Sequence, residues 1–274
     1  MKLNEAQSKA VSHVDGPMMV IAGPGSGKTT VITKRIKYLI ESAGVSPADI
    51  LVITFTRAAA GEMQQRFRAM TPGKEYPVRF GTFHSIFYWI LKTAYGQSML
   101  CVISEEEKRG IIELIYENKE EIVSSIVSQV SLVKCDMMDV ENYYSKDMPE
   151  HAFRELYRRL GTELKRRKLI DFDDMMVLCY ELLTARPDIL DKCRSLFPYI
   201  MVDEFQDSND FQMLFISELI NTSKFESLMV VGDDAQAIYL FRGTSPENII
   251  NFEEKLGAGL PVEEYLLTEN YRSA

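Results

Sequence analysis

The amino-acid sequence predicts an α/β fold in which a parallel sheet is interrupted by an all-helical segment. Three observations lead to this prediction. A glycine-rich loop at 22–29 stands between an apolar run and an amphipathic stretch. Strand-like and helix-like stretches alternate over the first 95 residues, which is typical of parallel sheets. The alternation stops over 104–168, and strand-like apolar runs return at 199.

Length and composition allow a sizeable hydrophobic core and exclude several classes of protein. The 274 residues are 46% hydrophobic, enough for one large or two smaller domains. No apolar run reaches the length that spans a membrane, and the N-terminus carries charges and amides where a signal peptide needs apolar residues. We therefore expect a cytoplasmic protein with no membrane partner. The net charge of −9 argues against a general polyanion binder but leaves room for a local basic groove.

The first elements follow from apolar runs and helix formers. Residues 3–7 open a short helix before the first strand. Proline and glycine at 72–73 end the helix that follows the second strand. We expect strands at 18–21, 50–55 and 78–82, and helices at 30–41, 58–70 and 84–95.

A helical insertion is expected next. Residues 104–168 contain no convincing strand, and Ser104 with Glu107 forms the capping-box pattern of a helix start. The last helix of this stretch, at 151–168, holds seven basic residues against two acidic ones. We hypothesise that it lines the path of a nucleic acid, although a solvated helix face is an equal alternative.

The α/β pattern then resumes. Asp171 is the expected N-cap of the first helix after the insertion. Continuous apolar runs predict strands at 199–202 and 228–231, buried on both faces, and a final strand at 262–267. The predicted division is therefore an α/β domain made of residues 1–100 and 169–274, with a helical insertion of residues 101–168.

The loop Ala22–Thr29 has the composition and context of a phosphate-binding loop. Glycines let backbone N–H groups surround an anion, and the helix that follows adds the positive end of its dipole. Lys28 can reach the β- and γ-phosphates of a nucleotide, and the Thr29 hydroxyl can bind Mg²⁺. Ala22 replaces the first glycine of the strict motif, where a small residue is enough. The alternative is a simple glycine-rich turn before a helix, which gives Lys28-Thr29 no packing role.

Acidic and amide residues follow two of the predicted strands. Asp203 and Glu204 come directly after the strand at 199–202, and Gln236 lies just past the strand at 228–231. The ends of parallel strands are where such sheets bind ligands. Beside a phosphate loop, Asp203 would hold Mg²⁺ and Glu204 would deprotonate an attacking water. Tyr239 and Phe241 could stack on bases, but spacing alone favours a buried turn.

Eight short motifs follow one another along the chain. They are Gln7, AGPGSGKT (22–29), TFTRAAAGEM (54–63), GTFHS (81–85), DFDD (171–174), VDEFQD (202–207), VGDDAQAIYLFRG (231–243) and LTENYRS (267–273). In this order they resemble the superfamily 1 DNA helicases of the UvrD/Rep/PcrA type, and the resemblance covers the whole chain. It implies a RecA-like P-loop NTPase domain with an inserted helical subdomain, in an enzyme that uses ATP to translocate 3′ to 5′ on single-stranded DNA.

The resemblance implies roles for individual residues around Mg·ATP. Lys28, Glu204, Gln236 and Arg272 would be catalytic, with Glu204 as the base and Gln236 and Arg272 at the γ-phosphate. Thr29 and Asp203 would bind Mg²⁺. Residues around the nucleotide, with Gln7 reading the adenine and Tyr271 stacking on it, would be Gln7, Ala22, Gly23, Pro24, Gly25, Ser26, Gly27, Lys28, Thr29, Thr30 and Tyr271.

The resemblance also implies a path for single-stranded DNA or a 3′-tailed duplex. The residues on it would be Thr54, Phe55, Thr56, Arg57, Thr82, Phe83, His84, Tyr239, Phe241 and Arg242. The chain departs from the family at several of its sites. Phe241 stands where the family often has Trp, and Thr30 stands where studied relatives have an adenine-packing Arg. Arg57 begins an Arg-Ala pair in place of a frequent Asn-Lys.

The chain ends where the family's second motor lobe should begin, and this lobe would be the missing partner of the nucleotide site. We therefore expect a chain that binds Mg·ATP, hydrolyses it slowly and does not unwind DNA alone. Two alternatives remain: a nucleotide-gated binding module, and a small-molecule kinase with a helical lid. Stimulation of ATPase activity by single-stranded DNA, or phosphate transfer to a metabolite, would separate the three.

Overall fold

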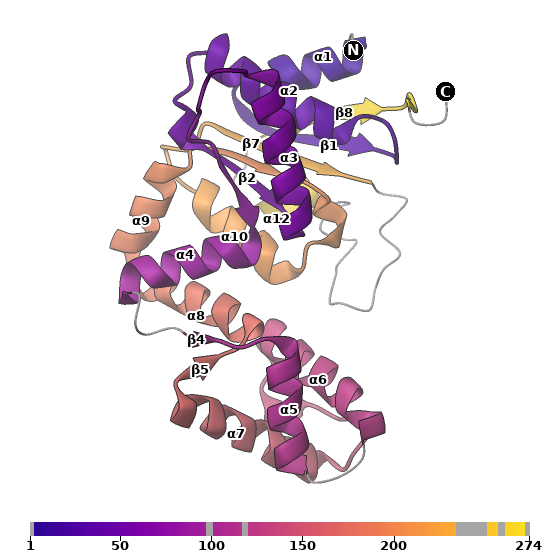
Figure 1. Ribbon diagram of the computed structural model, residues 1–274, viewed down its shortest axis with the longest axis vertical. Helices are drawn as coiled ribbons and strands as arrows, with labels where there is room; N and C mark the ends of the chain where they lie inside the picture. Colours follow the sequence, from indigo (N-terminus) through magenta and orange to yellow (C-terminus); the bar gives the residue numbers. More distant parts are fainter. Residues whose placement is uncertain (1–2, 97–100, 117–119, 234–250, 257–260, 272–274) are drawn as a thin grey trace. The chain divides into compact units, whose positions relative to one another are not determined.

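The computed structural model describes residues 3–96, 101–116, 120–233, 251–256 and 261–271, and it divides into two compact units. The first unit comprises Met1–Phe83 with Asp188–Ala274, and the second comprises His84–Pro187 (Figure 1). This division by compactness falls at other positions than the predicted boundaries of the insertion, 101 and 168, which stay a prediction.

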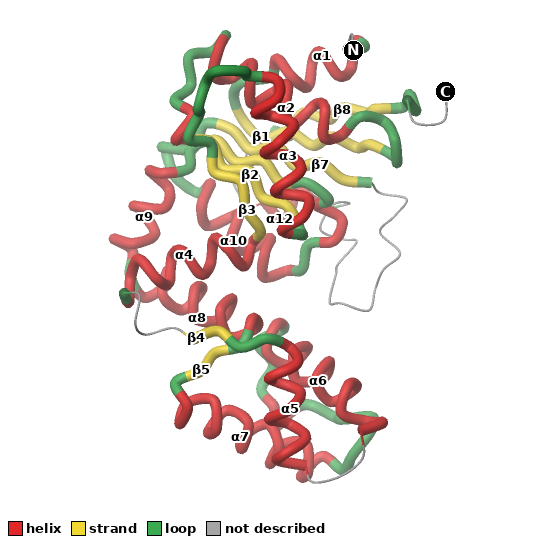
Figure 2. The backbone as a smooth tube through the Cα atoms, viewed as in Figure 1, coloured by secondary structure: helices red, strands yellow, loops and turns green. Residues whose placement is uncertain are grey.

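The first unit contains a parallel six-stranded sheet, with strand order β3-β2-β6-β7-β1-β8 (Figure 2). All five strand pairings are parallel. All six expected strands are confirmed, and no end differs by more than two residues from the expected one. The strands are β1 (Gly16–Ala22), β2 (Ile50–Thr54), β3 (Arg79–Thr82), β6 (Tyr199–Val202), β7 (Ser227–Gly232) and β8 (Glu263–Leu267).

Two inner strands, β2 and β7, are buried along their whole length, as continuous apolar runs predict. Every residue of β2 and β7 is buried. Because side chains alternate between the two faces of a strand, every second residue joins the same core. Met18, Val20 and Ala22 of β1 share one cluster with Val31, Ile32, Ile36 and Leu39 of α2.

The helices of the first unit begin and end near their expected positions. Asn4 caps α1 through a capping box with Gln7, and Thr56 caps α3. Figure 1 shows α2 and α3 running beside each other over the sheet. The helices are α1 (Glu5–Ser12), α2 (Lys28–Glu41), α3 (Arg57–Met70), α9 (Pro187–Leu196), α10 (Asp210–Ile220) and α12 (Phe252–Leu256), with 3₁₀ turns at Pro47–Asp49 and Phe205–Asp207.

A buried arginine joins three elements of the first unit. Arg35, on α2, is 1% exposed. Its guanidinium donates to the carbonyls of Ala10 and His13 near the end of α1, and to Ser227 Oγ on β7 at 2.8 Å. Burial lowers the pKa of Arg35 to about 10. The helix that follows the phosphate loop is thus tied to α1 and to the sheet.

The second unit is mainly helical, and its core is formed by α5, α6 and α7. The capping box of Ser104 and Glu107 is confirmed at the start of α5. One pair of two-residue strands flanks the predicted insertion and was not expected. The elements are α4 (Phe83–Tyr95), β4 (Cys101–Val102), α5 (Glu105–Tyr116), α6 (Glu120–Cys135), a 3₁₀ turn at Val140–Asn142, α7 (Glu150–Arg167), β5 (Leu169–Ile170) and α8 (Phe172–Ala185).

The acidic DFDD motif lies in a buried ionic cluster of the second unit. Asp171 is the N-cap of α8, as expected, and it pairs with Lys108 at 2.9 Å and with Lys134 at 2.8 Å. Burial would raise the pKa of Asp171, but the two lysines outweigh this effect and hold it at about 2. Lys108 also pairs with Asp173, and Lys134 with Asp174. The motif therefore joins α8 to α5 and α6.

None of the helices within the described ranges combines the length and the apolar character needed to span a bilayer.

Candidate nucleotide-binding site

The glycine-rich loop lies between β1, which ends at Ala22, and α2, which begins at Lys28. Gly25 and Gly27 have φ angles of +78° and +91°, in the left-handed region that favours glycine. A Cβ added to Gly27 would lie 3.1 Å from Nε2 of Gln7, so a side chain there would also have to displace the Gln7 carboxamide slightly. The loop conformation therefore depends on these two glycines.

Four consecutive carbonyls of the loop accept hydrogen bonds, three of them from residues outside the loop. Gly23 O accepts from Ser26 Oγ at 2.7 Å, within the loop. Pro24 O accepts from Asn270 Nδ2 at 3.0 Å, and Gly25 O accepts from Tyr271 N at 2.9 Å. Ser26 O accepts from Gln7 Nε2 at 3.0 Å. Because Pro24 O and Ser26 O are held in this way, the N–H groups of Gly25 and Gly27 point away from these partners, as an anion-binding loop requires.

Lys28 and Glu204 meet beside this loop. Lys28 Nζ lies 3.0 Å from Oε2 of Glu204, and Nε2 of Gln206 donates to the same oxygen at 2.8 Å. Oε1 of Gln206 in turn accepts from Asp233 N at the end of β7. Glu204 has φ of +51°, a conformation that few residues other than glycine adopt. Such backbone outliers cluster at functional sites.

Asp203 follows β6 and is 6% exposed. Burial, reinforced by the neighbouring charge of Glu204, raises its pKa to about 6. A carboxylate whose negative charge is destabilised by burial gains much from a nearby cation, so Asp203 is a suitable ligand for one. Mg²⁺ prefers oxygen ligands and often takes only one or two carboxylates besides phosphate oxygens. The residues present, Asp203 and the half-buried Thr29, thus fit Mg²⁺ with a nucleotide; Thr30 is also half-buried.

The two residues predicted to hold adenine are joined through Asn4. Asn4 Nδ2 donates to the Tyr271 hydroxyl at 3.1 Å, and Asn4 N donates to Oε1 of Gln7 at 3.1 Å. The carboxamide of Gln7 keeps one further donor and one acceptor. Because Gln7 is only 1% exposed, an adenine reaches these groups only after its neighbours move. Its predicted role stays a prediction.

Several residues of the predicted DNA path follow β2 and β3, which are neighbours in the sheet. Thr54 is in register with Thr82, and the rings of Phe55 and Phe83 contact edge to face at 6.1 Å. Thr54, Thr82 and Phe83 are buried. Phe55 is half-buried, and Thr56 and Arg57 are exposed. A DNA strand that reached this surface would meet Phe55, Thr56 and Arg57 before the buried residues.

The remaining predicted DNA and γ-phosphate residues belong to the second unit or lie outside the described residues. His84 belongs to the second unit, where its ring contacts Phe172 edge to face at 5.5 Å. Gln236, Tyr239, Phe241, Arg242 and Arg272 lie outside the described residues.

The basic helix of the second unit, α7, is partly neutralised by carboxylates. Glu163 pairs with Arg166 at 2.8 Å and with Arg167 at 2.6 Å, and these hydrogen bonds lower its pKa to about 2. Glu141 pairs with Arg154 and Arg158. These pairs weaken the field that a phosphate backbone would meet.

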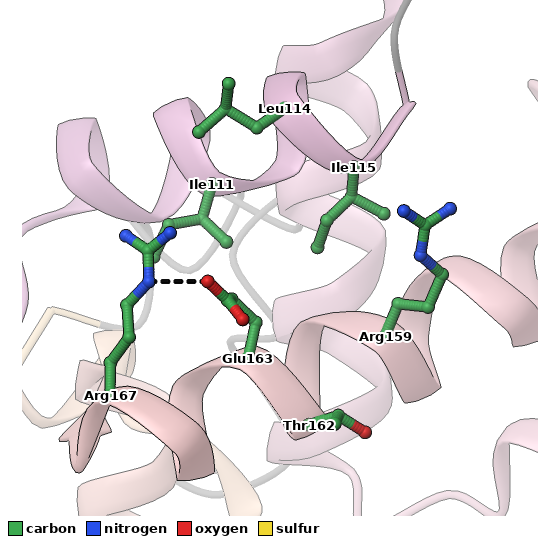
Figure 3. A pocket seen from close by; sticks show the side chains of 7 residues that line it. All are labelled: Ile111, Leu114, Ile115, Arg159, Thr162, Glu163 and Arg167. Carbon is green, nitrogen blue, oxygen red and sulfur yellow. Dashed lines mark hydrogen bonds and ion pairs between the residues drawn. The ribbon is translucent and has the colours of Figure 1, made fainter.

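A hollow of about 360 Å³ lies between α5 and α7. Figure 3 shows Leu114, Ile111 and Ile115 on the α5 side, and Glu163 paired with Arg167 on the α7 side. The apolar α5 side and the carboxylate of Glu163, which already pairs with Arg167, make this hollow a poor match for a nucleotide's phosphates. None of its lining residues belongs to the glycine-rich loop. The candidate nucleotide site is therefore defined by the loop, Asp203 and Glu204, and not by this hollow.

Sequence reasoning missed the residues that support the site. Asn4, Gln206 and Asn270 each place a loop or a functional side chain. Gln206 and Asn270 stand inside quoted motifs, so their amides beside charged neighbours offered a signal. The burial of Arg35 had no signal in the sequence, because a basic residue on an amphipathic helix is expected on the exposed face of that helix.

The parallel sheet with a phosphate loop at the end of β1 defines a P-loop nucleotide-binding domain. Comparison with known families is more specific: the UvrD/REP helicase N-terminal domain matches residues 3–257. This chain belongs to that family.

Similar proteins support this assignment. The protein YjcD of Bacillus subtilis (strain 168) is 37% identical over 282 residues, covering 99% of this chain and 36% of YjcD. The ATP-dependent DNA helicase PcrA of Leuconostoc citreum is 35% identical over 285 residues, covering 99% of this chain and 37% of PcrA. PcrA of Staphylococcus epidermidis is 33% identical, with 38% of its length covered. The chain thus spans little more than a third of the length of these relatives.

Proposed function

We propose that this chain binds Mg·ATP at the loop Ala22–Thr29 and forms the nucleotide-binding lobe of a motor that moves 3′ to 5′ on single-stranded DNA. The contact between Lys28 and Glu204 carries this proposal, since it brings a phosphate-loop lysine to a carboxylate beyond β6. The relatives named ATP-dependent DNA helicases support the class of activity.

In this proposal the residues act in a defined order. Mg·ATP supplies the electrophilic γ-phosphoryl group and the charge of the metal. Lys28 binds the β- and γ-phosphates and so leaves Glu204. Asp203 and Thr29 would hold the metal. Glu204, oriented by Gln206, would then accept the proton of the water that attacks the γ-phosphorus, and ADP would leave with the bridging oxygen.

The proposal includes slow turnover by this chain alone. An arginine supplied from another lobe or protein accelerates P-loop hydrolysis by roughly 10³–10⁵. The relatives are longer, and we propose that their remaining length forms such a lobe. Its arginine would act at the γ-phosphate beside Gln236 and Arg272 of this chain. The chain would then bind ATP, hydrolyse it slowly and leave duplex DNA unopened.

Contacts with single-stranded DNA would be made by Phe55, Thr56 and Arg57. Their exposure, and their position after β2, support this assignment. The arginines of α7 that pair with Glu163 and Glu141 are a weaker candidate surface. Charge reversal at Arg57 should weaken binding and lower its salt dependence, whereas reversal at Arg166 should change both little.

One experiment separates the proposal from its alternatives. Fluorescence anisotropy of a labelled dT₂₀ strand would be recorded with and without Mg and a non-hydrolysable ATP analogue, beside an assay for inorganic phosphate. We expect binding of both ligands and slow phosphate release to water. ATP binding without DNA binding would favour a nucleotide-gated module for another partner. Transfer of phosphate to a metabolite would favour a kinase.

A further inference from the structure

Residues just beyond β8 contact the phosphate loop from the far end of the chain. Asn270 Nδ2 donates to Pro24 O at 3.0 Å. The next residue, Tyr271, donates its backbone N–H to Gly25 O at 2.9 Å. Two consecutive peptide groups of the loop are therefore held by two consecutive residues of one segment, which we call the 270–271 strap.

A hydrogen bond to a carbonyl also orients the N–H of the following residue. The peptide group is planar and trans, so its C=O and N–H point to opposite sides. Fixing Pro24 O toward Asn270 turns the N–H of Gly25 away from the strap. Gln7 does the same for the N–H of Gly27 by holding Ser26 O. Both N–H groups belong to the glycines with left-handed φ angles.

Glycine peptide groups need this support more than others do. Without a Cβ, Gly25 and Gly27 have many accessible backbone conformations, and each conformation lost on binding costs entropy. A loop that is fixed before the anion arrives loses less on binding, and this gain appears as affinity. The side chain of Asn270 supplies one of the strap's two hydrogen bonds, and a substitution there removes this bond without changing the backbone donor of Tyr271.

We propose that Asn270 is a positioning residue of the phosphate loop, which raises affinity for the phosphate chain by holding Pro24 O. This inference rests on the proposed binding of Mg·ATP at the loop. The hydrogen bond of Asn270 goes to the loop and not to a base, so the proposal places its effect on the phosphates. Tyr271 differs in this respect, because its predicted contact is with adenine.

The test compares two probes that share a chain of three phosphates, of which only ATP carries a nucleoside. Dissociation constants for ATP and for inorganic tripolyphosphate, each with Mg²⁺, would be measured by calorimetry. The variants are Asn270→Leu, which keeps a similar size without charge or donor, and Asn270→Ala. Asn221→Ala, at the exposed C-terminal end of α10, is the matched control.

Both Asn270 variants should weaken ATP and tripolyphosphate by the same factor, roughly three- to tenfold, which is the weight of one neutral hydrogen bond. Asn221→Ala should change neither. Tyr271→Ala should weaken ATP more than tripolyphosphate. Unchanged tripolyphosphate binding in both Asn270 variants would overturn the inference, as would a loss confined to ATP. Failure of the unaltered chain to bind either probe would instead overturn the proposed function itself.

Hydrogen exchange supplies a readout that a general loss of stability would not produce. Tripolyphosphate should slow exchange of the Tyr271 amide, because the loop and the strap stabilise each other reciprocally. In Asn270→Leu this slowing should shrink, while the amides of β7 keep their protection. An undiminished slowing at Tyr271, or an equal loss of protection in β7, would contradict the proposal.

Discussion

The ammonium group of Lys28 lies 3.0 Å from a carboxylate oxygen of Glu204, although the two residues are 176 positions apart. The side chain of Lys28 is 12% exposed and that of Glu204 is 38% exposed, so Glu204 is the more accessible partner of the pair. The γ-phosphate of a bound nucleotide would compete with Glu204 for this lysine. Nucleotide binding and release of the proposed base are therefore one event in this account.

Replacing Glu204 with Gln should separate binding from hydrolysis. The amide keeps the shape of the side chain but cannot take a proton, so ATP hydrolysis should fall by about 100-fold or more. The affinity for ATP should stay the same or rise by a few-fold, because Lys28 loses a charged competitor. Single-turnover phosphate release and calorimetry would measure the two effects. Glu264→Gln, on the exposed face of β8, is the control, and hydrolysis that persists in Glu204→Gln would show that another group is the base.

Binding of Mg²⁺ should depend on pH through Asp203. Its pKa is raised to about 6 by burial, so the carboxylate is mainly protonated at pH 5 and mainly ionised at pH 7. Metal ligands must be deprotonated, and the Mg²⁺ affinity in the presence of ATP should therefore fall by about tenfold from pH 7 to pH 5. Asp203→Asn should reduce this dependence to the part that protonation of ATP itself contributes, and should remove most of the metal affinity of the site. A metal affinity that is flat across this range would exclude Asp203 as the ligand.

The same shift has a defined sign for stability. A carboxyl whose pKa is higher in the folded than in the unfolded state favours folding when it is protonated. The contribution of Asp203 should therefore become more favourable as the pH falls from above 6 towards 4. Asp203→Asn should flatten this part of the stability curve, measured by urea unfolding at several pH values.

Arg35 should matter for stability more than any exposed arginine. Arg35→Met leaves the carbonyls of Ala10 and His13 without their buried donor, and should lower the free energy of unfolding by about 2–4 kcal/mol. Arg35→Lys should recover part of this loss, because one ammonium group cannot reproduce the guanidinium fork.

Arg66→Met is the matched control for Arg35, since Arg66 forms an exposed ion pair with Glu62 one helical turn away. Such a pair contributes only about 0.3–0.5 kcal/mol. Urea unfolding curves would compare the three variants. Equal losses for Arg35→Met and Arg66→Met would show that the buried contacts of Arg35 contribute little.

The sheet and the phosphate loop could be predicted because their signals are local. Continuous apolar runs mark β2 and β7, and the glycines of the loop stand directly before α2. Position in the sheet could not be read in this way: Glu204 meets Lys28 only because β6 and β1 are separated by a single strand, β7. The hydrogen bond of Asn270 to Pro24 spans 246 residues, and no periodicity announces such a contact. The burial of Phe83 could not be predicted for a different reason: an aromatic residue after a strand is equally compatible with a core and with a DNA surface.

Binding of Mg·ATP to the unaltered chain and to Lys28→Met tests the central claim most directly. Calorimetric titration at pH 7.5 should give saturable one-site binding to the unaltered chain. Lys28→Met removes the charge that would meet the β- and γ-phosphates and keeps a side chain of similar length. A hydrogen bond to a charged group contributes about 1.5–3 kcal/mol, so its loss should weaken ATP binding by up to about 100-fold. Equal affinities of the two proteins for ATP, or no binding to either, would contradict the account.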